Sequence, residues 1–355
     1  MIQKGKTFWV ERKLITLNKF YTKTHFLSIL LIWVGIELHG QDLHYSQFYN
    51  SPQNLNPALT GVFNGSQRYN LSLRDQWRFV PVPWTTFSGA FDSNILPVNK
   101  DYFYGWGINF NYDKQGDSRL VLAGLNLSGS ITKELDKKNL ITAGATLGFA
   151  RRGFNLTELT WDKQWDGIQF NSGGASGENF DLSAVTFLET GAGINYRWQK
   201  NTRTKIDAGI GAFHLYQPKT DFYNTDDKRL PMHLSLTAMG SFKIINALDL
   251  QLNVMQQLQT TYRESLFGAI GKIYLNQKRG SETQLYLGLG YRTAGSFIPS
   301  IALQFRQWYV GFSYDVDNTT INNALNSKRG GPEFHVRYIF SKVRPLSERK
   351  ACPIY

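Results

Sequence analysis

Cysteine, charge and long apolar runs are all scarce in this sequence. The single cysteine, Cys352, excludes a disulfide framework or a cysteine-based metal site within one chain. Charged residues make up only 19% of the chain. After residue 40, no segment reaches the roughly 18 consecutive apolar residues that indicate a membrane-spanning helix. The part of the chain after residue 40 therefore crosses a membrane as a β-barrel or does not cross it at all.

Motifs of catalysis and cofactor binding are also missing. There is no Gly-x-Ser-x-Gly elbow and no convincing nucleophile–base arrangement. None of the Gly-x-Gly pairs completes a dinucleotide-binding fingerprint; they lie at Gly105/Gly107, Gly191/Gly193, Gly209/Gly211 and Gly288/Gly290. This spacing puts both glycines of a pair on one strand face, where they relieve crowding inside a barrel or permit bending. We predict no enzyme activity, no catalytic residue and no cofactor.

The histidines do not indicate a metal site. No two of them stand at ligand spacing in the mature chain, which contains His44, His214, His233 and His335. His214 and His233 flank a segment that holds Asp221, Asp226 and Asp227. This segment could be interpreted as a surface cation site or as a solvated loop. We expect the solvated loop and predict no bound metal.

Aromatic residues and glycine are abundant. Phe, Trp and Tyr account for 14% of the chain, and there are 32 glycines, a composition that suits strands in contact with lipid. The formal charge is +12, but residues 1–40 hold six Lys or Arg and two Asp or Glu, which leaves +8 for the rest. Because these basic residues are scattered among turns and strand ends, we predict no nucleic-acid partner.

The first 40 residues have the features of a secretion signal. Residues 4–23 carry six basic side chains, and residues 26–36 form an apolar core. That core is too short to span a bilayer, which takes about 20 helical residues. A basic region, a short apolar core and a small residue before a polar start are typical of a signal peptide. We predict cleavage after Gly40; the alternative is a monotopic anchor helix.

Apolar and polar residues alternate with a period of two through most of the mature chain, which is typical of strands with one greasy and one hydrated face. In one such segment Ile141, Leu147 and Phe149 share a face opposite Thr142 and Thr146. We therefore predict an all-β fold, a transmembrane antiparallel barrel of about 14 strands. The strands are expected near residues 68–75, 84–95, 102–112, 119–132, 139–152, 182–198, 203–216, 231–243, 247–258, 262–275, 282–293, 297–306, 307–315 and 332–341.

The connections between these strands alternate in length. Those after even-numbered strands are short, whereas the segments 153–181, 217–230 and 316–331, each after an odd-numbered strand, are long. Outer-membrane barrels have short periplasmic turns and longer outer loops. An even number of strands puts both ends of the barrel chain on the periplasmic side. A soluble β-sandwich, the structural alternative, would not be expected to show this alternation.

The stretch 42–61 joins the leader to the first strand. Its polar, aromatic and proline mixture is neither helix-like nor strand-like, and a residue before proline, such as Asn56, is pushed into extended geometry. We predict an extended strap that could fold back to plug the lumen. The resulting division of the chain is a signal peptide (1–40), an extended periplasmic or lumenal strap (41–67), a barrel (68–341) and a periplasmic C-terminal tail (342–355).

Short motifs along the mature chain carry a family resemblance. They occur in order as Tyr45-Ser46-Gln47, Asn56-Pro57-Ala58 and Gly61 in the strap, Arg74, Gln76 and Trp77 with Pro83-Trp84-Thr85-Thr86 at the start of the barrel, and Glu333 to Phe340 with Cys352-Pro353 at the end. The chain resembles the PorP/SprF family of outer-membrane proteins associated with type IX secretion in Bacteroidota. Pro81-Val82-Pro83 departs from the more glycine-rich turn of the family pattern, which bears on the subtype.

The resemblance implies a non-enzymatic protein of the bacterial outer membrane, exported through its signal peptide. Its expected partners are membrane lipids together with type IX secretion components or a large secreted cargo protein with a C-terminal sorting domain. The protein would help to export or anchor that cargo, for example in gliding motility or adhesin anchoring. We predict partner contacts at Trp77, Arg78, Trp161 and Trp165, since aromatic and arginine side chains dominate interfaces. Interfacial anchoring or internal packing is the alternative for these four residues.

Two other functions are the alternatives. The first is a diffusion channel or a transporter of hydrophobic compounds, because barrels of this size serve either purpose and fold alone does not decide function. The second is a secreted sandwich that binds carbohydrate, which would yield a soluble product after export. Conductance in a lipid bilayer distinguishes the first from a docking protein.

Overall fold

The structure is a computed structural model that divides into two units, residues Met1–Leu38 and His39–Tyr355. It describes residues 43–76, 84–97, 101–116, 119–155, 159–178, 182–223, 229–260, 262–278, 280–293, 295–317 and 330–342. The predicted signal peptide and most of the C-terminal tail lie outside the described residues, as do Trp77, Arg78 and Cys352. Within the described ranges, no helix is long and apolar enough to cross a lipid bilayer.

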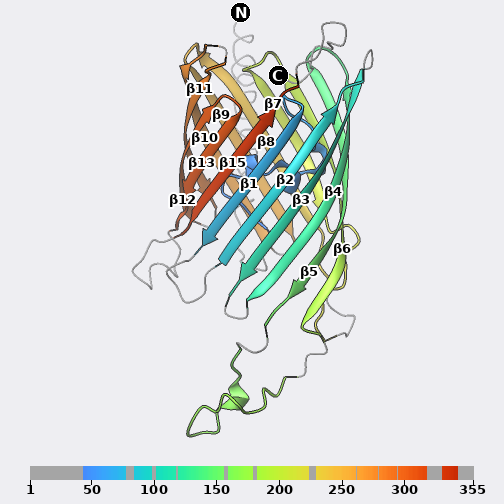
Figure 1. Cartoon of the computed structure of the whole chain (residues 1–355), viewed down its shortest axis with the longest axis vertical. Helices are drawn as coiled ribbons and strands as arrows, with labels where there is room; N and C mark the ends of the chain where they lie inside the picture. The colour runs from blue at the N-terminus through green and yellow to red at the C-terminus, as the bar shows by residue number, and fades with distance from the viewer. Residues whose placement is uncertain are drawn as a thin grey trace, which may run out of the picture. The chain divides into compact units, whose positions relative to one another are not determined.

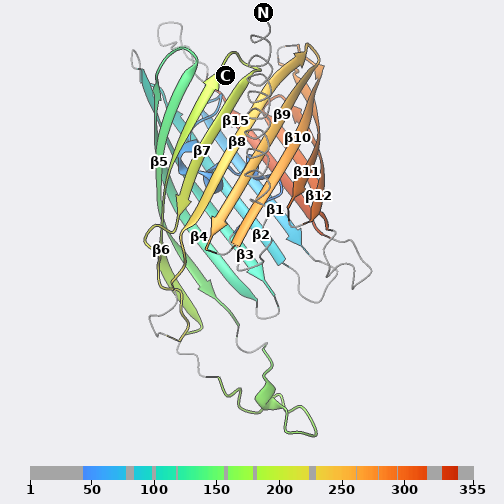
Figure 2. The same cartoon turned by 180° about the vertical axis from the view of Figure 1, so that it is seen from behind.

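The second unit is a closed antiparallel β-barrel (Figures 1 and 2). From β1 to β12 each strand pairs with its neighbours in sequence, β13 pairs with β12 and β15, and the ring closes where β1 pairs with β15. The strands are β1 (Gln67–Gln76), β2 (Trp84–Ile95), β3 (Tyr102–Gln115), β4 (Leu120–Glu134), β5 (Asn139–Gly153), β6 (Ala184–Gln199), β7 (Lys205–Phe213), β8 (His233–Ile245), β9 (Leu248–Gln259), β10 (Tyr262–Asn276), β11 (Thr283–Arg292), β12 (Ser296–Phe305), β13 (Trp308–Tyr314), β14 (Val316–Asp317) and β15 (Pro332–Phe340).

The barrel has 14 strands across its wall, as predicted, because β14 continues β13. Both pair with β12 in one unchanged register, which places Pro299 opposite Tyr314. Proline has no backbone N–H and cannot donate to the ladder. The strand is therefore interrupted at Asp315, a break that the alternation of residues did not predict.

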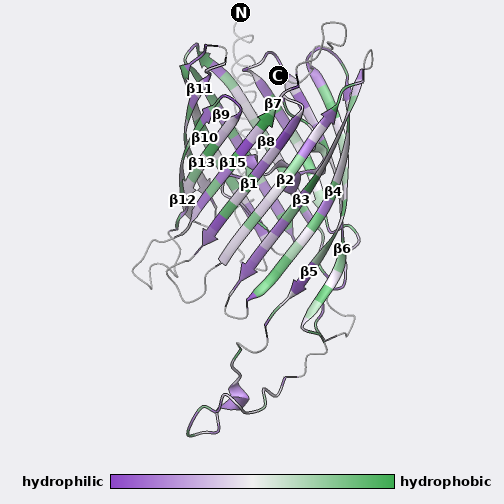
Figure 3. Ribbon diagram, in the orientation of Figure 1, coloured by the Kyte–Doolittle hydropathy of each residue, from purple (hydrophilic) through white to green (hydrophobic). Residues whose placement is uncertain are grey.

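The predicted faces of the strands are confirmed. Phe149 is 65% exposed on the outer face of β5, whereas Thr142 on the inner face is 2% exposed. Figure 3 shows hydrophobic and hydrophilic residues alternating along the strands. The three long connections also lie where they were expected, after β5, after β7 and between β14 and β15. Because consecutive strands run antiparallel, these connections share one end of the barrel, and the short connections after the even-numbered strands β2 to β12 share the other (Figure 1).

The prediction of an extended strap is wrong in its local structure. The described part of this stretch contains three helical turns, η1 (Phe48–Asn50), α2 (Pro52–Leu55) and η2 (Pro57–Leu59). Two prolines stand at the first positions of α2 and η2, where the missing N–H costs nothing, so they start turns as well as stop them. Asn56 has the extended geometry expected before proline, and its Oδ1 accepts from the Ala58 N–H at 2.9 Å.

Candidate functional site

Residues 43–66, which we call the lumenal segment, cross the interior of the barrel (Figure 2). Asn56 Nδ2 donates to the Ile194 carbonyl on β6 at 3.0 Å. Gln47 Nε2 donates to Ser313 Oγ on β13 at 3.1 Å. These two strands are seven positions apart in a ring of 14, so they stand on opposite walls. The lumenal segment therefore bridges the full width of the lumen.

Apolar packing fastens the lumenal segment to both walls. Val62 packs with Phe103 on β3 and Leu140 on β5. A second cluster joins three residues of the segment to β9, β10 and β12 and consists of Phe48, Leu55, Leu59, Met255, Leu266 and Ile298. All nine side chains are buried. Burial of a large apolar side chain contributes about 1.5–3 kcal/mol, so these contacts hold the segment in place.

Inward-facing glycines make room for the lumenal segment. A Cβ placed on Gly144 of β5 would lie 2.6 Å from the Pro57 backbone, and one on Gly209 of β7 would lie 2.7 Å from Asn56 Nδ2. The same holds for other glycines whose Cβ would meet the segment, namely Gly105, Gly107, Gly193, Gly211 and Gly311. Most of the Gly-x-Gly pairs noted in the sequence thus relieve crowding, as expected. The crowding neighbour is the chain's own N-terminal segment.

Buried charges gather where the lumenal segment begins. Arg74 Nη2 lies 2.6 Å from Asp315 Oδ2, and Arg74 Nε lies 3.8 Å from Glu333 Oε2. Arg74 Nη1 also donates to the His44 carbonyl at 2.8 Å. All three charged side chains are at most 2% exposed. Two carboxylates and one guanidinium from β1, β15 and the β13–β14 break therefore meet in a buried site, where charges require close pairing.

The lumenal segment completes this charge cluster with its own polar groups. The Ser46 and Gln47 N–H groups donate to the two Glu333 carboxylate oxygens, at 2.7 and 2.8 Å. The Ser46 hydroxyl donates to Asp315 Oδ1 at 2.6 Å and accepts from Arg292 Nη2 at 2.8 Å. Hydrogen bonds to ionised groups are stronger than those between neutral groups. Ser46 and Gln47 of the first motif therefore attach the start of the lumenal segment to the barrel wall.

Two further buried ion pairs lie near the two ends of the lumenal segment. Arg292 Nη1 on β11 lies 3.1 Å from Glu264 Oε1 on β10. At the other end of the segment, Arg68 Nη2 lies 2.6 Å from Asp92 Oδ2, which also accepts from the Gly61 N–H at 2.7 Å. Gly61 has a φ of +72°, a left-handed conformation that favours glycine. The fully buried Asp92 thus fixes the point where the chain turns towards β1.

The structure brings together most of the motif residues named from the sequence. The strap residues are all buried within the lumenal segment, namely Tyr45, Ser46, Gln47, Asn56, Pro57, Ala58 and Gly61. Arg74 and Gln76 are buried on β1 beside them. Trp77 and Arg78 lie outside the described residues. Asp92, Asp315 and Glu333 were missed as site residues, although each stands at an inward position of an alternating strand, which was the available signal.

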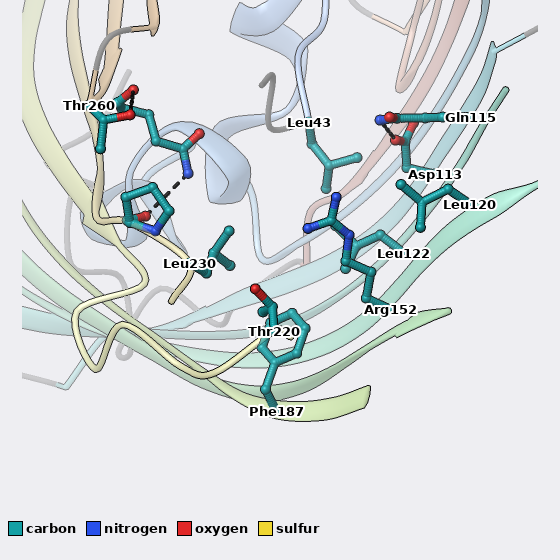
Figure 4. Close-up of a pocket in the computed structure, with 12 residues that line it drawn as sticks. Leu43, Asp113, Gln115, Leu120, Leu122, Arg152, Phe187, Thr220, Leu230 and Thr260 are labelled. Atoms are coloured by element: carbon teal, nitrogen blue, oxygen red, sulfur yellow. Dashed lines mark hydrogen bonds between the residues drawn. The ribbon is translucent and has the colours of Figure 1, made fainter. Parts of the chain in front are cut away.

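A cavity of about 250 Å³ lies at the end of the barrel that carries the long connections (Figure 4). Leu43 of the lumenal segment lines it, and Figure 4 shows the Arg152 guanidinium of β5 pointing into it. We call it the mouth cavity. Its other lining residues are Asp113, Gln115, Leu120, Leu122, Phe187, Thr220, Leu230, Pro231, Gln259 and Thr260.

A smaller cavity of about 50 Å³ shares Leu43 with the mouth cavity and is lined by His214 and His233. These histidines are 4% and 3% exposed, so the two residues that flank the expected solvated loop are themselves buried. His214 Nδ1 lies 3.2 Å from Glu189 Oε2 on β6, which draws the histidine inward. In the described part of the chain, no group of three His, Cys, Asp or Glu could hold a metal ion.

The connection between β5 and β6 contains the two predicted contact residues that the structure describes. Trp161 is half-buried and precedes η4 (Asp162–Gln164), and its backbone N–H donates to Gln164 Oε1 at 2.9 Å. Gln164 Nε2 in turn donates to the Ser172 carbonyl at 3.2 Å. Trp165 pairs with Phe170 in an isolated β-bridge. The loop is therefore internally bonded around the buried Gln164.

The tip of this loop presents apolar side chains to solvent. Trp165, Ile168 and Phe170 are 55%, 88% and 46% exposed. The tip is closed by Asp166, whose Oδ1 accepts from the Gln169 and Ile168 N–H groups at 2.8 Å. These two bonds hold the pKa of Asp166 below its usual value. We call residues 165–170 the loop tip.

Comparison with known proteins identifies a family. A family model described as "Type IX secretion system membrane protein PorP/SprF" matches residues 37–338. None of the curated proteins matches the chain. The family match and the closed barrel both indicate an outer-membrane protein. They also indicate a secretion or channel type of barrel rather than an enzyme class.

The chain is similar to solved structures of other barrels. The toluene transporter TbuX of Ralstonia pickettii is 14% identical, with 81% of this chain and 92% of that chain covered and a TM-score of 0.48. A FadL homologue of Pseudomonas aeruginosa is 11% identical, with coverages of 82% and 94% and a TM-score of 0.45. The translocator domain of the autotransporter NalP from Neisseria meningitidis is 10% identical, with coverages of 83% and 96% and a TM-score of 0.34.

Proposed function

Because the chain belongs to the PorP/SprF family of type IX secretion system membrane proteins, we propose that it is a docking component of that system and conducts no solute. It holds a secreted partner, such as a gliding or adhesin-type protein, at the cell surface or assists its export. The contact is made with the C-terminal domain of that partner or with the periplasmic secretion machinery. No step of this function requires chemistry on a substrate.

The observation that carries the proposal is the lumenal segment. It bridges β6 and β13 through Asn56 and Gln47. The carboxylates of Glu333 and Asp92 bind its backbone near the two ends. A diffusion channel needs a continuous aqueous path, and a segment held by buried ion pairs obstructs that path. The lumenal segment therefore supports binding over conduction, and it disfavours the channel or transporter alternative.

The loop tip supplies a contact surface of suitable chemistry. Its three exposed apolar side chains, Trp165, Ile168 and Phe170, stand on an internally bonded loop, so little ordering entropy is lost on binding. Aromatic anchors of this kind dominate the energetics of interfaces. Trp161 supports the base of the loop through Gln164. The predicted contact at Trp165 is kept in this proposal, with Ile168 and Phe170 added to it.

Co-purification from gently solubilised outer membranes tests the docking function. We expect a secreted cargo protein or type IX subunits to elute with the tagged chain. Replacement of Trp165, Ile168 and Phe170 by serine should release a cargo held at the outer face. The matched control is Leu135→Ser, because Leu135 is 56% exposed in a short turn at the opposite end of the barrel. Loss of type IX subunits only in the Leu135 variant would assign the contact to the machinery.

Planar-bilayer recording tests the conduction alternative. The wild-type barrel should show no steady conductance, whereas deletion of residues 43–61 should open a pore if the barrel still closes. Heat-modified migration on a gel reports whether the deleted form is folded. A wild-type barrel that elutes alone and conducts as steadily as the deleted form would favour the channel and defeat the proposal.

A further inference from the structure

The mouth cavity has the features of a small-molecule site. It is concave, its volume is about 250 Å³, and its walls come from β3, β4, β5, β6 and β9 together with the connection after β7. Pockets of this kind combine an apolar lining with a few convergent polar groups. Here Leu43, Leu122, Leu230 and Phe187 form the apolar part that Figure 4 shows around the centre.

The charged side chains that line the cavity indicate which polar group a ligand would carry. The Arg152 guanidinium points into the centre, and it carries five N–H donors, enough to bind a carboxylate while it keeps other bonds. The carboxylate of Asp113 lies in the wall, where its oxygens accept from Thr86 Oγ1 at 2.6 Å and from Gln115 Nε2. The Asp113 carboxylate thus accepts hydrogen bonds from two neutral donors at the side of the cavity. The cation faces the space that a ligand would fill.

We propose that the mouth cavity binds a small amphipathic carboxylate. Its apolar body packs among Leu43, Leu122, Leu230 and Phe187, and its carboxylate bonds to Arg152. Because Leu43 belongs to the lumenal segment, a bound ligand also packs against the start of that segment. This site is separate from the loop tip, so the proposal stands whether or not the docking function is correct.

The neighbouring residue on β5 provides a matched control. Arg151 and Arg152 are consecutive, so their side chains point to opposite faces of the strand. Arg151 is exposed and does not line the cavity, whereas Arg152 is half-buried and does. Replacement of either arginine by glutamine removes one charge from the same part of the barrel. A difference between the two variants therefore reports the cavity and not the net charge.

Equilibrium dialysis with labelled 3-phenylpropanoate and the full chain in phospholipid nanodiscs tests the proposal. Binding should saturate at one site per barrel, and 3-phenylpropanol and 3-phenylpropylamine should bind at least about tenfold more weakly, since a charge-assisted bond is absent. Arg152→Gln should weaken binding of the acid by about tenfold or more. Arg151→Gln should leave it unchanged. Leu122→Trp, which fills the cavity, should abolish saturable binding.

Several results would overturn the site. These are equal binding of the acid and the alcohol, tighter binding of the amine, equal losses in the Arg151 and Arg152 variants, or unchanged binding in Leu122→Trp. Heat-modified gel migration confirms that each variant is a closed barrel before binding is measured. Should Arg152→Gln not fold, the comparison of the three ligands and the Leu122→Trp variant decide the question on their own.

Discussion

Arg74 on β1 and Asp315 at the β13–β14 break are 241 residues apart in sequence, yet Arg74 Nη2 donates to Asp315 Oδ2 at 2.6 Å. The two residues flank β15 in the ring, close to where the first and last strands pair. We call the place where β1 pairs with β15 the closure seam. The ion pair therefore stabilises this seam, and through the bond from Arg74 to the His44 carbonyl it also holds the start of the lumenal segment.

Replacement of Arg74 should destabilise the barrel strongly. Arg74→Met leaves Glu333 buried without its cation and leaves Asp315 with only Arg292, whose Nη2 lies 3.5 Å from Asp315 Oδ2. Breaking a buried pair in this way costs about 3–5 kcal/mol. Guanidinium-induced unfolding in lipid vesicles measures the loss. Arg151→Met, on an exposed arginine, is the control and should change stability by less than about 1 kcal/mol. Equal stability of the two variants would show that the seam does not depend on the ion pair.

A side chain at Gly144 should displace the lumenal segment. In Gly144→Val the new Cβ would lie 2.6 Å from the Pro57 backbone, which cannot move as a flexible side-chain end could. We expect a less stable barrel and easier protease access to residues 43–66. Gly129→Val on the adjacent β4 is the matched control, since a Cβ there meets nothing within 4 Å. The same protease pattern in both variants would contradict the close approach.

Removal of the Asn56 amide should loosen the segment without a steric clash. Asn56→Ala loses the bond to the Ala58 N–H and the bond to the Ile194 carbonyl, and leaves both groups without these partners. A buried polar group without its partner costs about 1–3 kcal/mol. Hydrogen exchange of the Ala58 amide should therefore accelerate. Asn64→Ala changes an exposed amide of the same segment and should leave that exchange rate as it is.

Acid should open the turn between β4 and β5. The Lys138 N–H and the Asn139 side chain donate to Asp136 and hold the pKa of its carboxyl below the usual 3.8. A carboxyl with a lowered folded-state pKa stabilises the turn above pH 3.8, and this contribution is lost as the pH falls through the lower, folded-state pKa. Amide protection of Lys138 and Asn139, corrected for intrinsic exchange, should fall in that range. Asp136→Asn should remove the pH dependence, and a dependence that persists would point to another group.

Much of the barrel could be predicted from the sequence because its cause is local. Each strand must present apolar residues to lipid and polar residues to the lumen, so the period of two appears within a single segment. The expected range 84–95 matches β2 residue for residue. The break at Asp315 was missed because its cause, Pro299, lies on the neighbouring strand. Boundaries elsewhere differ by a few residues: β3 extends beyond its expected range, whereas β7 is shorter than expected.

The sequence by itself determined the strand number, the inner and outer faces, the end that carries the long connections and the family. Only the tertiary structure decided where residues 43–66 go and what the inward charges do. Asn56, Gly144 and Gly209 are far apart in the chain, and their fit depends on the closed wall that brings them together. The pairing of Arg74 with Asp315 likewise exists only after β1 meets β15. Local patterns record which face a residue takes, whereas the partner across the lumen is set by closure of the ring.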